Sequence, residues 1–142
     1  MKKKLNAFFL IMVISFCCLI QSGCNEEKNV TDLWDTATYK TDTEFGDGET
    51  TVTVNLKVNE KSVTFTINTE KPTLGEALTE HELIFGENDV YGMYVKKVNG
   101  IEADYDKDKS YWAFYKDGDY LVSGVDTTEI SDGDSFEIVY TK

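Results

Sequence analysis

Aromatic side chains are the residues of this sequence best suited to bind a ligand. Eight of them fall within 30 residues: Tyr91, Tyr94, Tyr105, Tyr111, Trp112, Phe114, Tyr115 and Tyr120. Tyr and Trp combine a rigid apolar ring with a polar tip, which suits a planar ligand or a partner surface. Over residues 111–115 the pattern predicts a strand, so Trp112 and Phe114 share one face and Tyr111 and Tyr115 the other. One face must be core, and the sequence leaves open which.

Residues that could catalyse a reaction are few. His81 is the only histidine, and it falls near the end of a predicted helix, where a positive side chain suits the helix dipole. A cysteine–histidine pair and a histidine-rich metal site both need partners that the exported chain lacks. A serine triad around His81, or a pair of catalytic carboxylates, has no supporting motif. We therefore predict no enzyme, no catalytic residue and no cofactor.

Three carboxylates, Asp104, Asp106 and Asp108, have the alternate spacing of a calcium-binding loop. The EF-hand pattern requires Gly at its sixth position and Glu at its twelfth, where this chain has Lys109 and Tyr115. Carboxylates on a loop between strands are usually solvated, so no metal site is predicted.

The N-terminus has the pattern of a bacterial export signal. Three lysines, residues 2–4, precede an apolar stretch over 5–20, which is shorter than the roughly 20 residues that span a membrane. The segment Ser22-Gly23-Cys24 resembles a lipobox, in which the cysteine is diacylated and becomes the mature N-terminus, although Gln21 departs from the usual Leu. An ordinary secretory signal or an uncleaved anchor are the alternatives. Two acyl chains on Cys24, such as palmitate, would anchor the protein stably to the outer face of the cell membrane.

Removal of residues 1–23 would leave 119 of the 142 residues, enough for one domain. The remaining chain has 11 lysines, no arginine and 26 acidic residues, a net charge of −15. Such a charge argues against a nucleic-acid partner, whose affinity depends on neutralising phosphates. With Cys24 lipidated, no free thiol remains for a disulfide.

Hydrophobic periodicity predicts mostly strands after a polar tether over 24–48, which becomes structured from about Trp34. Alternating residues over 50–58 and 62–67 predict a hairpin. Thr73-Leu74-Gly75-Glu76 fits a capping box that opens a short helix ending near Glu82. Asn99-Gly100 predicts a second hairpin after a strand over 94–98.

Strands over 111–115, 120–122 and 136–140 complete the predicted domain, which covers residues 49–142. The order of hairpin, helix and further strands predicts an α+β fold. In it, one short helix packs across one face of a mixed sheet, as in β-grasp-like domains.

Four stretches together resemble a known family: residues 73–78, residues 91–95 with Val98-Asn99-Gly100, residues 111–115, and Gly124-Val125 with Asp132-Gly133-Asp134. In order and spacing they are similar to the transcobalamin-like C-terminal domain family of Gram-positive lipoproteins. The resemblance spans residues 50–142. It implies a β-grasp-like fold similar to the β-domain of intrinsic factor and transcobalamin, which covers one face of cobalamin.

The resemblance also implies a set of ligand-binding residues: Tyr91, Gly92, Met93, Tyr94, Trp112, Phe114, Tyr115 and Lys116. The helical domain that completes the vertebrate site has no counterpart in this chain. We therefore expect a cell-surface binding module for a small planar ligand such as cobalamin or another corrinoid, with an importer as a possible partner. The alternative is a protein–protein interaction domain of the cell envelope without a small-molecule ligand.

Overall fold

The computed structural model describes residues 31–142, which form one compact unit. The predicted signal segment, the lipidation site Cys24 and the first part of the predicted tether lie outside the described residues. Within residues 31–142, no helix has the length and apolar character needed to cross a membrane. Among the described residues, the first member of the buried cluster is Trp34.

Six strands form the larger sheet, in the order β1-β3-β2-β9-β7-β8. Their bounds are β1 Thr43–Phe45, β2 Thr50–Val58, β3 Lys61–Thr69, β7 Tyr111–Lys116, β8 Asp119–Tyr120 and β9 Ser135–Thr141. The β2–β3 hairpin confirms the predicted pair of alternating segments. The central pairing of β2 with β9 is parallel, with Val54 opposite Phe136, so the last strand of the chain lies beside one of the first.

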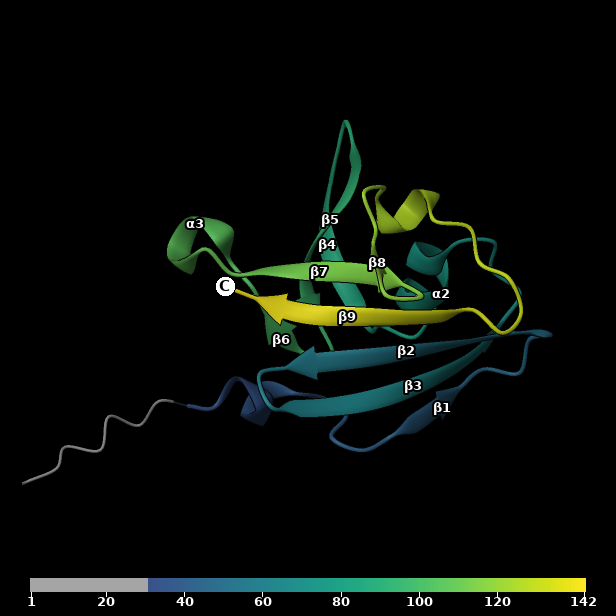
Figure 1. Cartoon of the computed structure of the whole chain (residues 1–142), viewed down its shortest axis with the longest axis horizontal. Coiled ribbons are helices and arrows are strands. Elements are labelled where there is room, and N and C mark those ends of the chain that lie inside the picture. The colour runs from purple at the N-terminus through teal and green to yellow at the C-terminus, as the bar shows by residue number, and fades with distance from the viewer. Residues whose placement is uncertain (1–30) are drawn as a thin grey trace, which may run out of the picture. The chain divides into compact units, whose positions relative to one another are not determined.

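A second sheet has three strands, in the order β4-β5-β6, with bounds β4 Ile84–Asp89, β5 Gly92–Val98 and β6 Ile101–Glu102. The predicted turn at Asn99-Gly100 joins β5 to β6, and both of its residues have the positive φ that this hairpin turn requires. The tip of the β4–β5 hairpin projects beyond the rest of the domain (Figure 1).

Short helices complete the domain: α2 Leu74–Glu80 and α3 Tyr105–Asp108, with the 3-10 turns η2 Leu33–Thr36 and η3 Val125–Thr127. The Thr73 hydroxyl accepts a hydrogen bond from the Glu76 amide at 3.3 Å, which is one half of the predicted capping box; the reciprocal bond to the Glu76 carboxylate is absent from the described residues. Leu74, Ala77 and Leu78 then face the core. Residues 31–142 therefore have a mixed α and β fold, mostly strands in two sheets with two short helices.

Strands β2 and β3 bury one face of the six-stranded sheet. Their apolar alternate residues, such as Val54 and Phe65, are at most 1% exposed, while the residues between them are mostly threonines and asparagines on the outer face. Helix α2 and the smaller sheet cover the buried face, because their apolar residues belong to the same cluster. This arrangement sets strand β7 opposite strand β5, and the candidate site lies there.

The structure corrects one expectation and adds two elements. A single mixed sheet was wrong: β4, β5 and β6 form a sheet of their own. Strand β4 and helix α3 were not predicted at all, because β4 is exposed after Ile84 and so lacks alternation, and α3 spans only one turn. Within the predicted tether, Trp34 belongs to the core and β1 pairs with β3.

Candidate functional site

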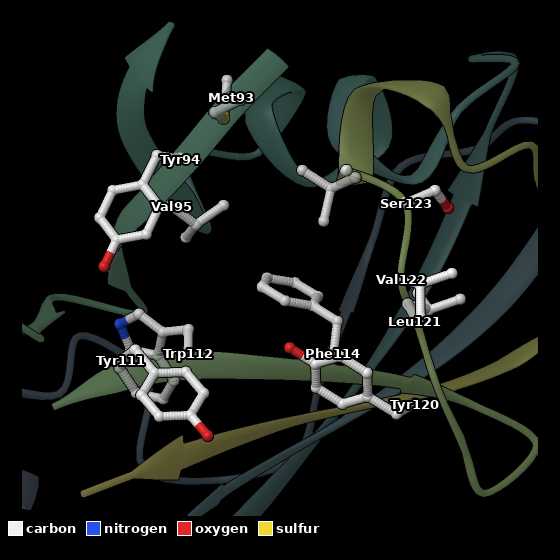
Figure 2. A pocket seen from close by; sticks show the side chains of 12 residues that line it. Met93, Tyr94, Val95, Tyr111, Trp112, Phe114, Tyr120, Leu121, Val122 and Ser123 are labelled. Atoms are coloured by element: carbon white, nitrogen blue, oxygen red, sulfur yellow. The ribbon is translucent and has the colours of Figure 1, made fainter. Parts of the chain in front are cut away.

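An open pocket of about 260 Å³ lies between strands β5 and β7 and the segment 121–125 (Figure 2). Its lining is aromatic, aliphatic or small: Met93, Tyr94, Val95, Tyr111, Trp112, Phe114, Tyr120, Leu121, Val122, Ser123, Gly124 and Val125. No side chain of this lining carries a charge. Tyrosine and serine hydroxyls lie among these apolar side chains, so the pocket can contact both the apolar and the polar groups of a ligand.

Strand β7 supplies the floor of the pocket. Trp112 pairs with Tyr140 and Phe114 with Ile138 on β9, so both side chains lie on the buried face of the sheet. Trp112 is 6% exposed, and its ring meets Tyr140 edge-on at 5.3 Å between ring centroids. Phe114 is only partly buried, and Figure 2 shows its ring rising from β7 into the space between the walls. This settles which face of the strand points inward.

Strand β5 forms one wall of the pocket, and segment 121–125 forms the other. Segment 121–125 is fixed at both ends. The Leu121 amide donates to the Phe114 carbonyl at 2.9 Å. At the other end, helix α2 packs against the turn η3 through Gly75, where a Cβ would lie 2.9 Å from the Asp126 amide nitrogen. The glycine therefore permits a close approach of the helix to this wall.

Asp126 links that wall to strand β5. Its Oδ2 accepts a hydrogen bond from the Met93 amide at 2.9 Å. Gly92, with a φ of +110°, lets the chain pass the carboxylate, because a Cβ there would lie 2.7 Å from Oδ2. Two pocket walls that are distant in sequence are thus joined by one carboxylate.

Four of the eight predicted ligand-binding residues line the pocket: Met93, Tyr94, Trp112 and Phe114. Gly92 directly follows the turn at the tip of the hairpin, opposite Asp89, and lies beside Asp126; Tyr91 in that turn is 89% exposed. Tyr115 is on the opposite face of β7 and meets Tyr120 edge-on at 5.5 Å.

Lys116 is also separate from the pocket, because its Nζ lies 2.7 Å from Asp134 Oδ2 and over the Phe136 ring. Burial is the largest single influence on the Asp134 carboxyl and would raise its pKa. Hydrogen bonds from Lys116 and from the Ser131 amide, together with the lysine charge, outweigh it and lower the pKa below its usual value. Lys116 therefore holds the 131–134 turn.

The sequence did not indicate the wall at 121–125. The pattern predicts a returning strand over residues 120–122, but pairing with β7 ends at Tyr120. Ser123 is exposed and Val125 is buried, although a strand would place both on one face. Val122 is 95% exposed, although a helix would place it on the same face as Val125. The only signal was the pair Gly124-Val125 within the family resemblance.

The other residues considered for chemistry lie elsewhere. His81 follows α2 and stacks on Phe45 at 5.2 Å between ring centroids. Asp104 caps α3, since its Oδ1 accepts from the Asp106 amide. Hydrogen bonds from Ser110, followed by that from Lys142, lower the pKa of Asp108 to about 2. Across residues 31–142, no three His, Cys, Asp or Glu residues are placed to hold a metal ion.

Comparisons with known proteins give a family without an established function. Residues 71–142 match the family described as "Domain of unknown function (DUF4430)". No curated protein matches. Among solved structures, a suspected metal binding protein from Ruminococcus gnavus is 30% identical with a TM-score of 0.63, over 66% of this chain and 98% of that one. Haptocorrin in complex with Cbi is 22% identical with a TM-score of 0.49, over 69% of this chain and 26% of that one.

Proposed function

The chain belongs to the family described as domain of unknown function DUF4430, and we propose that it is a binding module that captures a small ligand in the pocket between β5, β7 and residues 121–125. The observation that carries this proposal is the convergence of Met93, Tyr94, Trp112 and Phe114 on one uncharged pocket. These residues come from two separate sheets, and their selection from the sequence did not depend on the pocket.

The proposed ligand is a corrinoid such as cobalamin, or another planar molecule of similar character. The similarity of the sequence to the transcobalamin-like family supports a corrinoid as the ligand. The same similarity supports a β-grasp-like fold. At about 260 Å³, the pocket lies just below the range of about 300–1,000 Å³ common for drug-sized ligands. A corrinoid would therefore extend beyond it, over the exposed side chain of Val122.

The proposed setting is the outer face of the cell membrane, with the chain exported and anchored through a lipid on Cys24. The basic and apolar segments before Cys24 support it. The proposed role is capture without catalysis, with the ligand passed to an importer or another envelope protein.

An interaction domain without a small ligand is the second candidate, because several large apolar side chains are exposed. Val90 and Tyr91 at the hairpin tip are 91% and 89% exposed, and Val122 is 95% exposed. Exposed apolar residues gathered on a projecting element are typical of a surface that docks a protein. This candidate predicts a retained protein partner and no corrinoid titration.

Two phenylalanine substitutions test the site. Phe114→Ala removes the ring that enters the pocket, and we expect it to weaken cobalamin binding by tenfold or more, because burial of an aromatic ring contributes about 1.5–3 kcal/mol. Phe85→Ala is the matched control, because Phe85 on β4 is 51% exposed and does not line the pocket. Equal affinities for both variants, measured by calorimetry on folded protein, would reject this pocket as the site.

A further inference from the structure

The indole nitrogen of Trp112 has no hydrogen-bond partner among residues 31–142. Trp112 is 6% exposed, and its Nε1 is shielded from solvent. An indole nitrogen can only donate, so a water or ligand oxygen is the partner it requires. Buried donors without a partner are rare in folded proteins and call for an explanation.

Three other buried polar atoms among the described residues lack a partner, but all can be acceptors: Asn55 Oδ1, His81 Nε2 and Asp126 Oδ1. None of these residues lines the pocket. Trp112 Nε1 is thus the one obligate donor of the set, and it belongs to the floor of the proposed binding site.

We infer that the ligand of this pocket places a neutral carbonyl oxygen, of the amide or ester type, on the indole N–H of Trp112. The inference rests on the proposed function and specifies the chemistry of the ligand. The charge of the surroundings selects the neutral group. The pocket lining has no cationic side chain, and the chain as a whole has a net charge of −12, so a carboxylate would be desolvated without compensation.

Tyr94 is positioned to admit and supplement this contact. Its hydroxyl points toward the side of the pocket where the Trp112 nitrogen lies (Figure 2). Its side chain is 44% exposed and can shift as a ligand enters. The phenol can then donate a second hydrogen bond to the same carbonyl oxygen, which has two lone pairs.

The test removes the N–H and keeps the ring. The chain from Asn25 to Lys142 carries Trp34→Phe, so that Trp112 is its only tryptophan, and Trp112 is replaced biosynthetically by benzothienylalanine, in which sulfur takes the place of N–H. Trp34 belongs to the core but not to the pocket lining. The probe is cobalamin, whose corrin ring carries neutral amide side chains.

We expect cobalamin affinity to fall about threefold to tenfold, the usual contribution of one neutral hydrogen bond. The urea midpoint of the unliganded protein should stay the same or rise, because a buried donor without a partner has been removed. A loss of cobalamin affinity without a loss of stability indicates that the N–H recognises the ligand. If the N–H had a structural role, stability and affinity would fall together.

A nitrogen–proton NMR correlation spectrum gives a second readout in the Trp34→Phe protein. Its single indole N–H signal belongs to Trp112, and the proton of that N–H should shift downfield at saturation with cobalamin. Unchanged affinity and an unmoved indole signal, with cobalamin still bound, would overturn the inference and leave the proposed function standing. Absence of cobalamin binding to the unsubstituted protein would overturn both.

Discussion

Asp126 is the residue whose replacement should most clearly connect the fold to the pocket. Its Oδ2 accepts the Met93 amide at 2.9 Å and so joins strand β5 to the wall at 121–125. Hydrogen bonds to charged groups contribute about 1.5–3 kcal/mol. Desolvation of Oδ1, which is buried without a partner, opposes this stabilisation. For Asp126→Ala we therefore expect a loss of about 1–2 kcal/mol in the free energy of unfolding.

The assay is urea denaturation combined with hydrogen exchange and a cobalamin titration. In Asp126→Ala the Met93 amide should exchange faster, since it loses its acceptor, and cobalamin should bind more weakly because the two walls are no longer held together. Asp126→Asn keeps an oxygen at this position and should recover most of both properties.

A matched control is available at Asp132, whose Oδ1 accepts from the Thr51 amide at 2.8 Å outside the pocket. Asp132→Ala should lower stability and leave cobalamin affinity unchanged. If Asp126→Ala leaves both Met93 exchange and affinity at the level of the unsubstituted protein, Asp126 does not join the two walls, and the reasoning is wrong.

Three further predictions concern the core, the acid response and the anchor. Phe65→Ala should lower the free energy of unfolding by about 3–5 kcal/mol, because the ring is 1% exposed and its loss leaves a cavity; urea denaturation measures this. Asp108 has a folded-state pKa of about 2, below its usual 3.8, so its contribution to stability is complete above about pH 4 and is lost as the pH falls toward 2. In Ser110→Ala the pKa of Asp108, followed by NMR, should rise, since the Ser110 hydroxyl is the main cause of the depression. Cys24→Ser should move the protein from the membrane fraction to the soluble fraction, and a variant that remains wholly in the membrane fraction would reject the lipid anchor.

Local patterns predicted the local structure of this chain. The alternation in residues 50–58, the threonine cap of α2 and the Asn-Gly turn each depend on neighbours in sequence, and each is present. The turn also has a role that no local rule indicates. The Asn99 side chain accepts from the Tyr39 amide and donates to the Tyr39 carbonyl, both at 2.8 Å, and so fixes a segment 60 residues away.

The division into two sheets could not be predicted, because it depends on pairings between distant segments. Thr53 pairs with Ser135 in the parallel contact of β2 with β9, and nothing in either strand specifies this partner. For the same reason the sequence identified Trp112 and Phe114 as candidates but could not decide which face of β7 was inside. The wall at 121–125 has no regular periodicity, so only the structure identifies it as part of the site.

A calorimetric titration of residues 25–142 with cobalamin tests most directly whether the pocket binds a corrinoid-like ligand. We expect saturable binding at a 1:1 ratio, with a change in tryptophan fluorescence, since Trp112 forms the pocket floor. An absence of heat and of any fluorescence change at tens of micromolar cobalamin would contradict this expectation and favour the protein–protein interaction domain.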